Sequence, residues 1–263
     1  MSRWSDYSWR LIRGEPVEPA MNVAIDETLT RRVGAGESAP VLRFWGRYLS
    51  EVVIGRFQAV SNELDEATAR DYGVEVLRRT TGGGAMFVEP PNVITYSLCA
   101  PLSLVEGLST VDSYEFLDRW VVDALRGMGV DARYEPINDI TSADGKIGGA
   151  AQARRHGERY GAVLHHTTMA YDMDAEKMLR VLRVGKEKLS DKAVESAEKR
   201  VGPIRRQTAL SREEVIERMI STFGTRYIGE DNLTESTLTA GERAEAKELA
   251  AYYGSREWTY SLP

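Results

Sequence analysis

From residue 77 the chain reads Leu77-Arg78-Arg79-Thr80-Thr81-Gly82-Gly83-Gly84-Ala85-Met86-Phe87, with two arginines and three glycines between apolar runs. The pattern predicts a strand, a turn of bare backbone and a second strand. Three glycines cost about 2 kcal/mol relative to alanine, which is more than a hairpin turn requires. We expect a ligand to compensate for this cost, because glycine lets a phosphate or a carboxylate reach main-chain N–H groups while arginine supplies charge.

The chain has 263 residues, a formal net charge of −6 and a single cysteine. Its length is enough for one large α/β domain, and no linker, repeat or low-complexity tract divides it, so we predict one domain over residues 1–263. The acidic balance argues against a general nucleic-acid-binding protein, so any anion site must be local. One cysteine, no signal-peptide pattern and no run of roughly 20 apolar residues predict a cytoplasmic protein without a membrane partner.

Hydrophobic periodicity and capping residues predict alternating strands and helices. Strands are expected at residues 9–13, 41–45, 51–55 and 93–99, and helices at 20–33, 63–72 and 110–127, with further helices opened by Asp174, Ser211 and Thr239. Asn62 is the expected cap of the second helix. Asn22 and Asp26 share one face of the first helix, either as a solvated polar stripe or as groups that orient a site. Cys99 falls within a strand, where cysteine is usually a small core residue rather than a nucleophile.

A second group of residues that suggests a binding site lies between residues 138 and 168. Asn138-Asp139 precedes the run Asp144-Gly145-Lys146-Ile147-Gly148-Gly149-Ala150-Ala151-Gln152, and His165-His166 follows it. Lys146 is expected at the start of a strand whose small residues let a ligand approach the backbone. Two glycine-rich segments that both carry cations therefore predict the two sides of one pocket for an elongated anionic ligand. The charge-dense stretch 183–200, which includes Lys192, is compatible with a solvated face.

Taken together, these stretches resemble the lipoate-protein ligase family. Its hallmark is an Arg-Arg-x-x-Gly-Gly-Gly strand pair, here Arg78 to Gly84, followed by a Gly-Lys-(Lys)-Ile-x-Gly-x-Ala-Gln segment, here Gly145 to Gln152. Lys192 to Val201 resembles the adenylate-binding loop of the family. The resemblance implies an α/β (α+β) fold with a mixed, largely antiparallel sheet flanked by helices. It is the fold of biotin and lipoate ligases, related to the catalytic domain of class II aminoacyl-tRNA synthetases.

The resemblance also implies a reaction in two steps. Lipoate and ATP give lipoyl-adenylate and pyrophosphate, and a lysine of a lipoyl acceptor domain then takes the acyl group. Such acceptors are domains of the 2-oxoacid dehydrogenase E2 type or proteins like the glycine-cleavage H protein. Because a carboxylate attacks the α-phosphorus, the site must hold two anions together, which favours positioning and electrostatics over a nucleophilic side chain.

Within this resemblance, Lys146 is the expected catalytic residue, a cation that contacts both the carboxyl oxygen and the α-phosphate. The residues implied in substrate and ATP binding are Arg78, Thr81, Gly82, Gly83, Gly84, Asn138, Asp139, Gly148, Gly149, Ala150, Gln152, His166 and Lys192. Mg²⁺ is expected on phosphate oxygens and water, with Asp139 as the candidate side-chain contact. The acyl tail needs an apolar tunnel, for which the candidates are Val76, Met86 and Val163.

The sequence departs from the family pattern at two places. Val88-Glu89 stands where many members have His-Asp, and Thr167 stands where a glycine usually follows the histidine pair. Full-length members also carry a small C-terminal domain, and this chain stops where that domain would begin. In some relatives the small domain is a separate polypeptide, so we expect a small accessory subunit as a partner.

Three other functions compete with the ligase interpretation. An octanoyl or lipoyl transferase moves an acyl chain from a carrier protein through a thioester on a cysteine near Asn138-Asp139 or in a later loop, and Cys99 is at neither place. A non-catalytic lipoyl-binding module of the same fold would have no need of a cation at Lys146. A biotin ligase is expected to carry a Gly-Arg-Gly-Arg type of loop, which the sequence does not contain.

Overall fold

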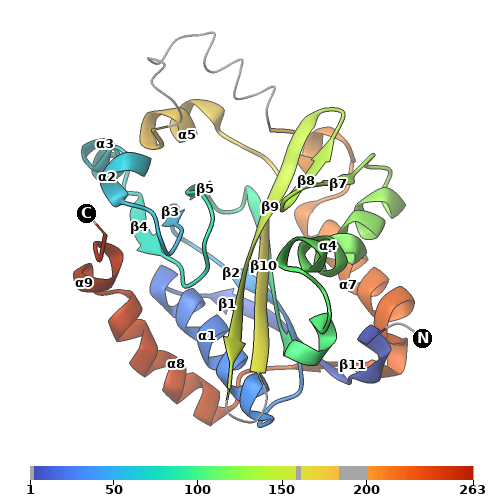
Figure 1. Cartoon of the computed structure of the whole chain (residues 1–263). Coiled ribbons are helices and arrows are strands. Elements are labelled where there is room, and N and C mark those ends of the chain that lie inside the picture. Colours follow the sequence, from blue (N-terminus) through green and yellow to red (C-terminus); the bar gives the residue numbers. More distant parts are fainter. Residues whose placement is uncertain (1–2, 158–160, 184–200, 263) are drawn as a thin grey trace.

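A computed structural model describes residues 3–157, 161–183 and 201–262 (Figure 1). Two sheets organise this part of the chain. The main sheet has the strand order β11 (Leu233–Ser236), β1 (Trp9–Pro16), β2 (Val41–Gly46), β6 (Val93–Pro101), β10 (Gly161–Ala170), β9 (Gly145–His156), β8 (Asp139–Ser142) and β7 (Arg133–Glu135). The small sheet has the order β4 (Glu75–Arg78), β3 (Glu51–Ile54) and β5 (Met86–Val88).

Most neighbouring strands run antiparallel. The parallel pairs are β1 with β11, β1 with β2, and β3 with β4. All other pairs, including the long ladders that β10 makes with β6 and β9, are antiparallel. This topology confirms the expected mixed, largely antiparallel sheet.

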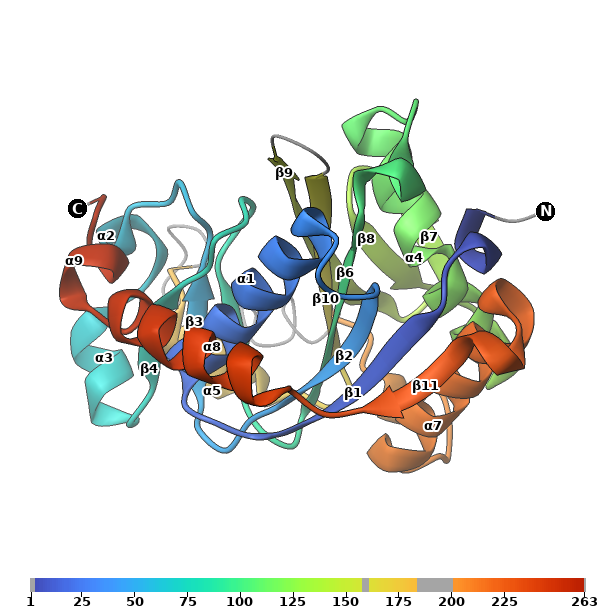
Figure 2. The ribbon, with the colours of Figure 1, turned by 90° about the horizontal axis from the view of Figure 1, so that it is seen from below.

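Helices cover both faces of the main sheet (Figures 1 and 2). The helix α1 (Pro19–Ala35) packs on one face with α8 (Ala240–Tyr253) outside it, and their apolar side chains share a core cluster with β2 and β10. The helices α4 (Thr110–Gly127) and α7 (Arg212–Thr222) pack on the other face around Trp120. Each face of β10 therefore meets a different helical layer, and successive side chains of this strand point to opposite environments.

The small sheet lies beside the main sheet, with three short helices around it (Figure 1). These helices are α2 (Val60–Glu63), α3 (Glu66–Asp71) and α5 (Ala175–Val181), and α9 (Arg256–Thr259) lies near β4. None of the helices within residues 3–157, 161–183 and 201–262 is long and apolar enough to cross a membrane.

Local capping signals correctly placed several helices. Ser211 and Thr239 each form the capping box with a glutamate three residues later, and Asp174 accepts a hydrogen bond from the N–H of Lys177. The helix predicted at residues 63–72 is present but begins three residues later, as α3, because Leu64 is extended and pairs with Leu182. Asp65 rather than Asn62 caps the helix α3 that follows, where it accepts from the N–H of Thr68.

The two apolar runs around the three glycines do not pair with each other. They form β4 and β5, but β3 lies between them and pairs with both. The segment that joins them, residues 79–85, therefore crosses the end of the small sheet as a loop. We call this segment the glycine loop.

Candidate active site

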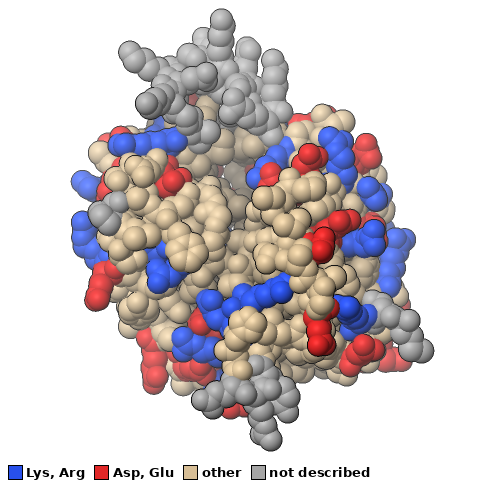
Figure 3. Space-filling model, viewed as in Figure 1, with Lys and Arg blue, Asp and Glu red and all other residues tan. Residues whose placement is uncertain are grey.

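Two adjoining cavities lie between the glycine loop and the main sheet. The first, which we call the Trp45 cavity, has a volume of about 120 Å³ and is lined by Trp45, Val53, Arg79, Ala151 and His166, among others. The second, the Met178 cavity, has a volume of about 200 Å³ and is lined by Phe87, Glu89, Met173, Met178 and Leu182, among others. Both are lined by Ala85, Met86, Lys146, Gly149 and Thr168. The face of the molecule that Figure 3 shows is hollowed in the middle. Most charged side chains on this face lie around the rim of the hollow rather than within it.

Lys146 stands where the two cavities meet. It lies at the start of β9, as the sequence predicted, and its Nζ is 2.7 Å from Oδ1 of Asp139 on β8. A Cβ at Gly149 would lie 3.2 Å from that Nζ and 3.4 Å from that Oδ1. The absence of a side chain at Gly149 thus leaves room for the ion pair, and the pair presents a cation to both cavities.

The glycine loop is wrapped around the guanidinium of Arg79. This group donates to the carbonyls of Val53, Gly82 and Gly84 and to the hydroxyl of Thr81. Gly83 has φ of +94°, and a Cβ there would lie 2.9 Å from Nη2 of Arg79. Burial lowers the pKa of Arg79 to about 10. Part of the reason for the glycines is therefore structural, since the loop must close around an arginine.

Arg78 points away from both cavities. Its buried guanidinium donates to the carbonyls of Gly55, Arg56, Gln58, Trp258, Thr259 and Leu262. This arginine ties the loop after β3 to the C-terminal helix α9, so its expected contact with a ligand does not occur in this geometry. The arginines that line the Trp45 cavity are Arg79 and Arg47, and neither was among the site residues expected from the sequence. Alternation along the strand was the available signal, because adjacent side chains point to opposite faces.

His166 faces the Trp45 cavity from β10. Its Nε2 lies 2.7 Å from Oγ1 of Thr81, and its ring centroid lies 6.0 Å from that of Trp45. Its Nδ1 lies 3.7 Å from Oδ2 of Asp26 on α1. Burial lowers the pKa of His166, although the carboxylate of Asp26 opposes that shift. Two residues of the expected set, Thr81 and His166, are thus brought together.

Asn22 and Asp26 belong to a buried polar network rather than to a solvated stripe. They are 0% and 1% exposed. Asp26 pairs with Arg43 at 2.7 Å and accepts from Ser97, while Nδ2 of Asn22 donates to the carbonyl of Gly46 at 2.9 Å. Burial alone would raise the pKa of Asp26, but the His166 ring and the charge of Arg43 bring this pKa below its usual value. Of the two alternatives for this helix face, the structure supports the one that orients the site.

Two residues that were expected in the site lie on the face of β9 and β10 that points away from the cavities. Gln152 exchanges hydrogen bonds with Ser113 on α4, and Val163 packs in the core on the same side. Both side chains point to the side of the sheet that α4 and α7 cover, so neither residue lines a cavity, contrary to the expectation from the sequence. Thr167 also lies on that side, where its hydroxyl donates to Asp118 at 2.8 Å.

The remaining expected residues divide between lining and packing roles. The side-chain amide of Asn138 donates to the carbonyl of Ala150, and the main-chain carbonyl of Asn138 accepts from the N–H of Ala150. Both residues line the Trp45 cavity. Gly148 lines the Met178 cavity, but a Cβ there would lie 2.8 Å from Cγ of Met169, so close packing of β10 also requires this glycine. Met86 lines both cavities, whereas Val76 packs in the cluster of the small sheet. Lys192 lies outside the described residues.

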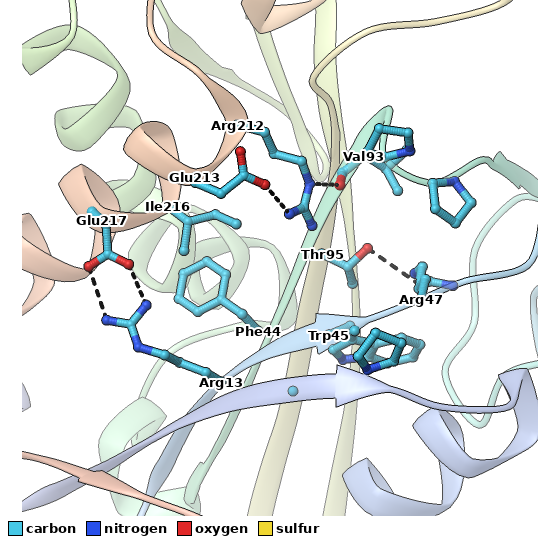
Figure 4. Close-up of a pocket in the computed structure, with 15 residues that line it drawn as sticks. Arg13, Phe44, Trp45, Arg47, Val93, Thr95, Arg212, Glu213, Ile216 and Glu217 are labelled. Atoms are coloured by element: carbon cyan, nitrogen blue, oxygen red, sulfur yellow. Dashed lines mark hydrogen bonds and ion pairs between the residues drawn. The ribbon is translucent and has the colours of Figure 1, made fainter.

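A third cavity, of about 280 Å³, lies on the far side of Trp45 and Arg47 (Figure 4). Trp45, Arg47 and Thr95 line both this cavity and the Trp45 cavity. Arg47 pairs with Glu51, and its Cζ lies 4.6 Å above the Trp45 ring. Burial lowers the pKa of Arg47 to about 9, as does the nearby charge of Arg43. Arg212 and the Arg13–Glu217 ion pair close the opposite side (Figure 4).

Cys99 is a core residue, as expected. It is 0% exposed on β6, and the hydroxyl of Thr30 lies 3.4 Å from its sulfur. Burial and the charge of Asp26 raise the pKa of its thiol. Because a thiolate is the nucleophilic form of cysteine, this position is unsuited to covalent catalysis.

The chain resembles known proteins in both sequence and structure. The family model of the lipoyl protein ligase A/B catalytic domain matches residues 18–224. Lipoate-protein ligase A subunit 1 of Thermoplasma acidophilum is 30% identical over 264 residues, which cover 96% of each chain. Octanoyltransferase LipM of Geobacillus kaustophilus is 29% identical over 279 residues, which cover 96% of this chain and 98% of that protein.

Solved structures give the same picture. A bipartite lipoate protein ligase from T. acidophilum, described with its E2 lipoyl domain, superposes with a TM-score of 0.85 at 31% identity, covering 98% of this chain and 97% of that one. A T. acidophilum protein with bound lipoic acid gives a TM-score of 0.81 at 28% identity, and a lipoate-protein ligase A bound with ATP gives 0.82 at 29%. Each of these two matches covers 97% of this chain and 100% of the other.

Proposed function

We propose that this chain, which belongs to the lipoyl protein ligase A/B catalytic-domain family, activates lipoate with ATP and passes the lipoyl group to a lysine of an acceptor domain. The match to the family model confirms the resemblance to lipoate-protein ligases that the two glycine-rich motifs indicated. The observation on which the proposal rests is the position of Lys146, whose cation lies at the junction of two cavities and beside the glycine loop.

The two cavities suit the two parts of an acyl-adenylate. The Trp45 cavity offers apolar walls for the acyl chain, from Trp45, Val53 and Met86, and the Met178 cavity is open to a nucleotide. The carboxylate and the α-phosphate would then meet at Lys146. Solved relatives carry lipoic acid in one case and ATP in another, which supports both ligands for this site.

In the first step a carboxylate oxygen attacks the α-phosphorus, a C–O–P bond forms and pyrophosphate leaves with the electrons of the broken P–O bond. Lys146 would stabilise the charge that two anions bring together, which is catalysis by preorganised electrostatics. In the second step the neutral acceptor amine attacks the carbonyl carbon, AMP leaves with the electrons of the broken C–O bond, and the nitrogen releases one proton to water. No step needs a nucleophilic side chain from this protein.

Magnesium would accompany ATP to this site. The described residues contain no cluster of three or more His, Cys, Asp or Glu side chains arranged to hold a metal. Asp139, at the rim beside Lys146, is the carboxylate we assign to a direct or water-mediated contact. One carboxylate with phosphate oxygens and water fits the usual coordination of Mg²⁺.

A transferase that works through a thioester is the second candidate, because octanoyltransferases are among the relatives. The single cysteine of the chain argues against it, since Cys99 is buried. We expect the Cys99→Ala variant to keep ATP-dependent lipoylation within about 3-fold of the unchanged protein, because a small buried side chain is replaced by a slightly smaller one. Acceptor lipoylation measured by mass spectrometry checks this. Loss of acyl transfer in Cys99→Ala, together with indifference to ATP, would favour the transferase.

We further propose two protein partners. The lipoyl acceptor is a domain of the E2 or H-protein type, in line with the relative described together with an E2 lipoyl domain. A separate small accessory subunit is the other partner, because the T. acidophilum relatives are named subunit 1 and bipartite. Both partners come to this chain by similarity.

One assay tests the whole proposal. The purified chain is incubated with ATP, Mg²⁺ and either lipoate or octanoate, with a lipoyl acceptor domain and with or without the candidate accessory subunit. We expect pyrophosphate release that depends on the presence of lipoate or octanoate. We also expect an acceptor that is heavier by one lipoyl group when lipoate is supplied, with more product when the accessory subunit is present. An acceptor that gains no acyl group in any combination would refute the ligase assignment, and full activity of the chain alone would refute the accessory subunit.

A further inference from the structure

Four buried side chains form a continuous line from α1 to the glycine loop. Asp26 lies on α1, His166 on β10, and Thr81 and Arg79 in the loop itself. Oδ2 of Asp26 is 3.7 Å from Nδ1 of His166, Nε2 of His166 is 2.7 Å from Oγ1 of Thr81, and Nε of Arg79 is 3.1 Å from the same Oγ1. These residues come from three segments far apart in the sequence, so only the fold brings them together.

The hydrogen positions in this line follow from donor chemistry. A guanidinium only donates, so the hydroxyl oxygen of Thr81 accepts from Arg79. Its own proton is then free for the nearest acceptor, which is Nε2 of His166. A neutral imidazole that accepts at Nε2 carries its proton at Nδ1, and that nitrogen faces Asp26. This arrangement is the Nδ1–H tautomer of His166, and its Nδ1 lies 3.7 Å from Oδ2 of Asp26, beyond hydrogen-bond distance.

Arg79 orients two peptide groups of the loop. Its guanidinium donates to the carbonyls of Gly82 and Gly84 at 2.6 and 2.9 Å. In a trans peptide the N–H points opposite to the carbonyl, so the N–H groups of Gly83 and Ala85 point away from Arg79. Within the described residues no hydrogen bond from these two N–H groups is present. Ala85 lines both cavities, where such donors suit an anion.

We infer that His166 is a positioning residue: as a neutral hydrogen-bond acceptor it fixes Thr81 and Arg79, and thereby aims the N–H group of Ala85 at the phosphates of ATP. The inference rests on the proposed function for the identity of the anion. It assigns His166 a role through the loop, in addition to its place in the wall of the Trp45 cavity. Asp26 acts on the Nδ1 side of the ring through its charge, at 3.7 Å and without a hydrogen bond.

Acid should disturb this arrangement. The charged and titratable groups around the ring are Asp26 from α1, Arg43 from β2, Arg47 after β2, Arg79 from the loop, Lys146 from β9 and His165 from β10. Burial lowers the pKa of His166, so the ring stays neutral at neutral pH. As the pH falls through that lowered pKa, Nε2 becomes a donor and a positive charge forms beside Arg79. Adenylation should then decline on the acid side.

The first test removes the hydroxyl in the line. Thr81→Val keeps the shape of the side chain, and we expect kcat of lipoate-dependent pyrophosphate release to fall by about 10²-fold, the size of loss that a misplaced binding group causes. KM for lipoate should change little, because the apolar walls remain. Thr81→Ser, which retains the hydroxyl, should restore most of the rate. Thr28→Val is the matched control, since Thr28 is buried and its hydroxyl has no hydrogen-bond partner among the described residues.

The second test needs no activity, and so separates a failure of this inference from a failure of the proposed function. The chain has three histidines, which makes ¹⁵N-labelled imidazole spectra assignable with single variants. We expect His166 as the Nδ1–H tautomer, and we expect Thr81→Val to shift its Nε2 resonance and the amide resonance of Ala85. An Nε2–H tautomer, or an Ala85 amide resonance that is unchanged in Thr81→Val, overturns the inference even in a working ligase.

The third test uses His166→Gln, whose side-chain oxygen accepts near the position of Nε2 and does not titrate. We expect this variant to keep much of the rate above neutral pH and to lose the acid-side decline of the unchanged enzyme. A residue that only fills space would leave the pH profile where it was. If His166→Gln follows the same acid limb as the unchanged enzyme, His166 is not the group that sets it, and the inference falls.

Discussion

Replacing Lys146 with alanine is expected to lower lipoate-dependent pyrophosphate release by about 10²–10³-fold, the loss that removal of one preorganised charge-stabilising donor causes. The reason is its position, since its Nζ lies where the two cavities meet and where the carboxylate and α-phosphate would approach each other. The measurement is the initial rate of pyrophosphate release with saturating ATP and lipoate. The second step should suffer less when synthetic lipoyl-adenylate is supplied, because the adenylate has already formed.

The controls separate charge from packing. Lys146→Arg keeps a cation on a longer, planar group and should recover part of the rate, whereas Lys146→Met keeps the stem and should recover none. Lys247→Ala, at an exposed lysine of α8, should behave as the unchanged enzyme. Asp139→Asn removes the ion-pair partner at 2.7 Å and should cost less than loss of the lysine itself. A Lys146→Ala variant that releases pyrophosphate at full rate would end the catalytic role of this residue.

The sequence predicted those elements whose signals are local. The capping boxes at Ser211 and Thr239 need only four residues, and the structure has both. The helix 20–33 and the strand that begins near Lys146 also follow from patterns within one segment. The family motifs then supplied the largely antiparallel sheet, which no local pattern specifies.

Local sequence patterns could not predict which distant segments pair with each other. The runs on either side of the three glycines looked like partners, but β3, which precedes them, takes both as neighbours. The helix expected at 63–72 begins only at Glu66, because Leu64 pairs with Leu182, more than a hundred residues later. Local periodicity carries no information about such partners, so tertiary contacts overrode it.

Within the candidate site, the motifs correctly predicted which segments border the cavities, but not which side chains of those segments line them. Both glycine stretches border the cavities, yet Arg78 and Gln152 point to other faces while Arg79 and Ala151 line the Trp45 cavity. A strand that enters a site exposes every second residue to it, and a motif does not say which half. The network behind His166 was also beyond the sequence, because Asp26, Arg43 and Ser97 come from three elements.

Replacing Asp26 with alanine is expected to destabilise the protein by about 3–5 kcal/mol, the cost of leaving a buried charge without its partner. Arg43 would be that charge, because it is 1% exposed and its pairing with Asp26 at 2.7 Å would be lost. Urea unfolding followed by tryptophan fluorescence measures the change in the free energy of unfolding. A loss below about 1 kcal/mol would mean that the pair contributes no more than an exposed one.

A double-mutant cycle decides whether the cost comes from the unpaired charge. Arg43→Met alone leaves Asp26 buried without a cation, and Asp26→Ala alone leaves Arg43, so both should be strongly destabilised. The double variant removes both charges and should lose clearly less than the sum of the two. The pH dependence gives an independent check. Because the pKa of Asp26 is lowered in the folded chain, its contribution is present above the unfolded pKa and disappears as the pH falls through the folded value, so acid should narrow the gap between Asp26→Ala and the unchanged protein. A gap that stays constant on acidification would show that the destabilisation arises from lost packing rather than from the charge of Asp26.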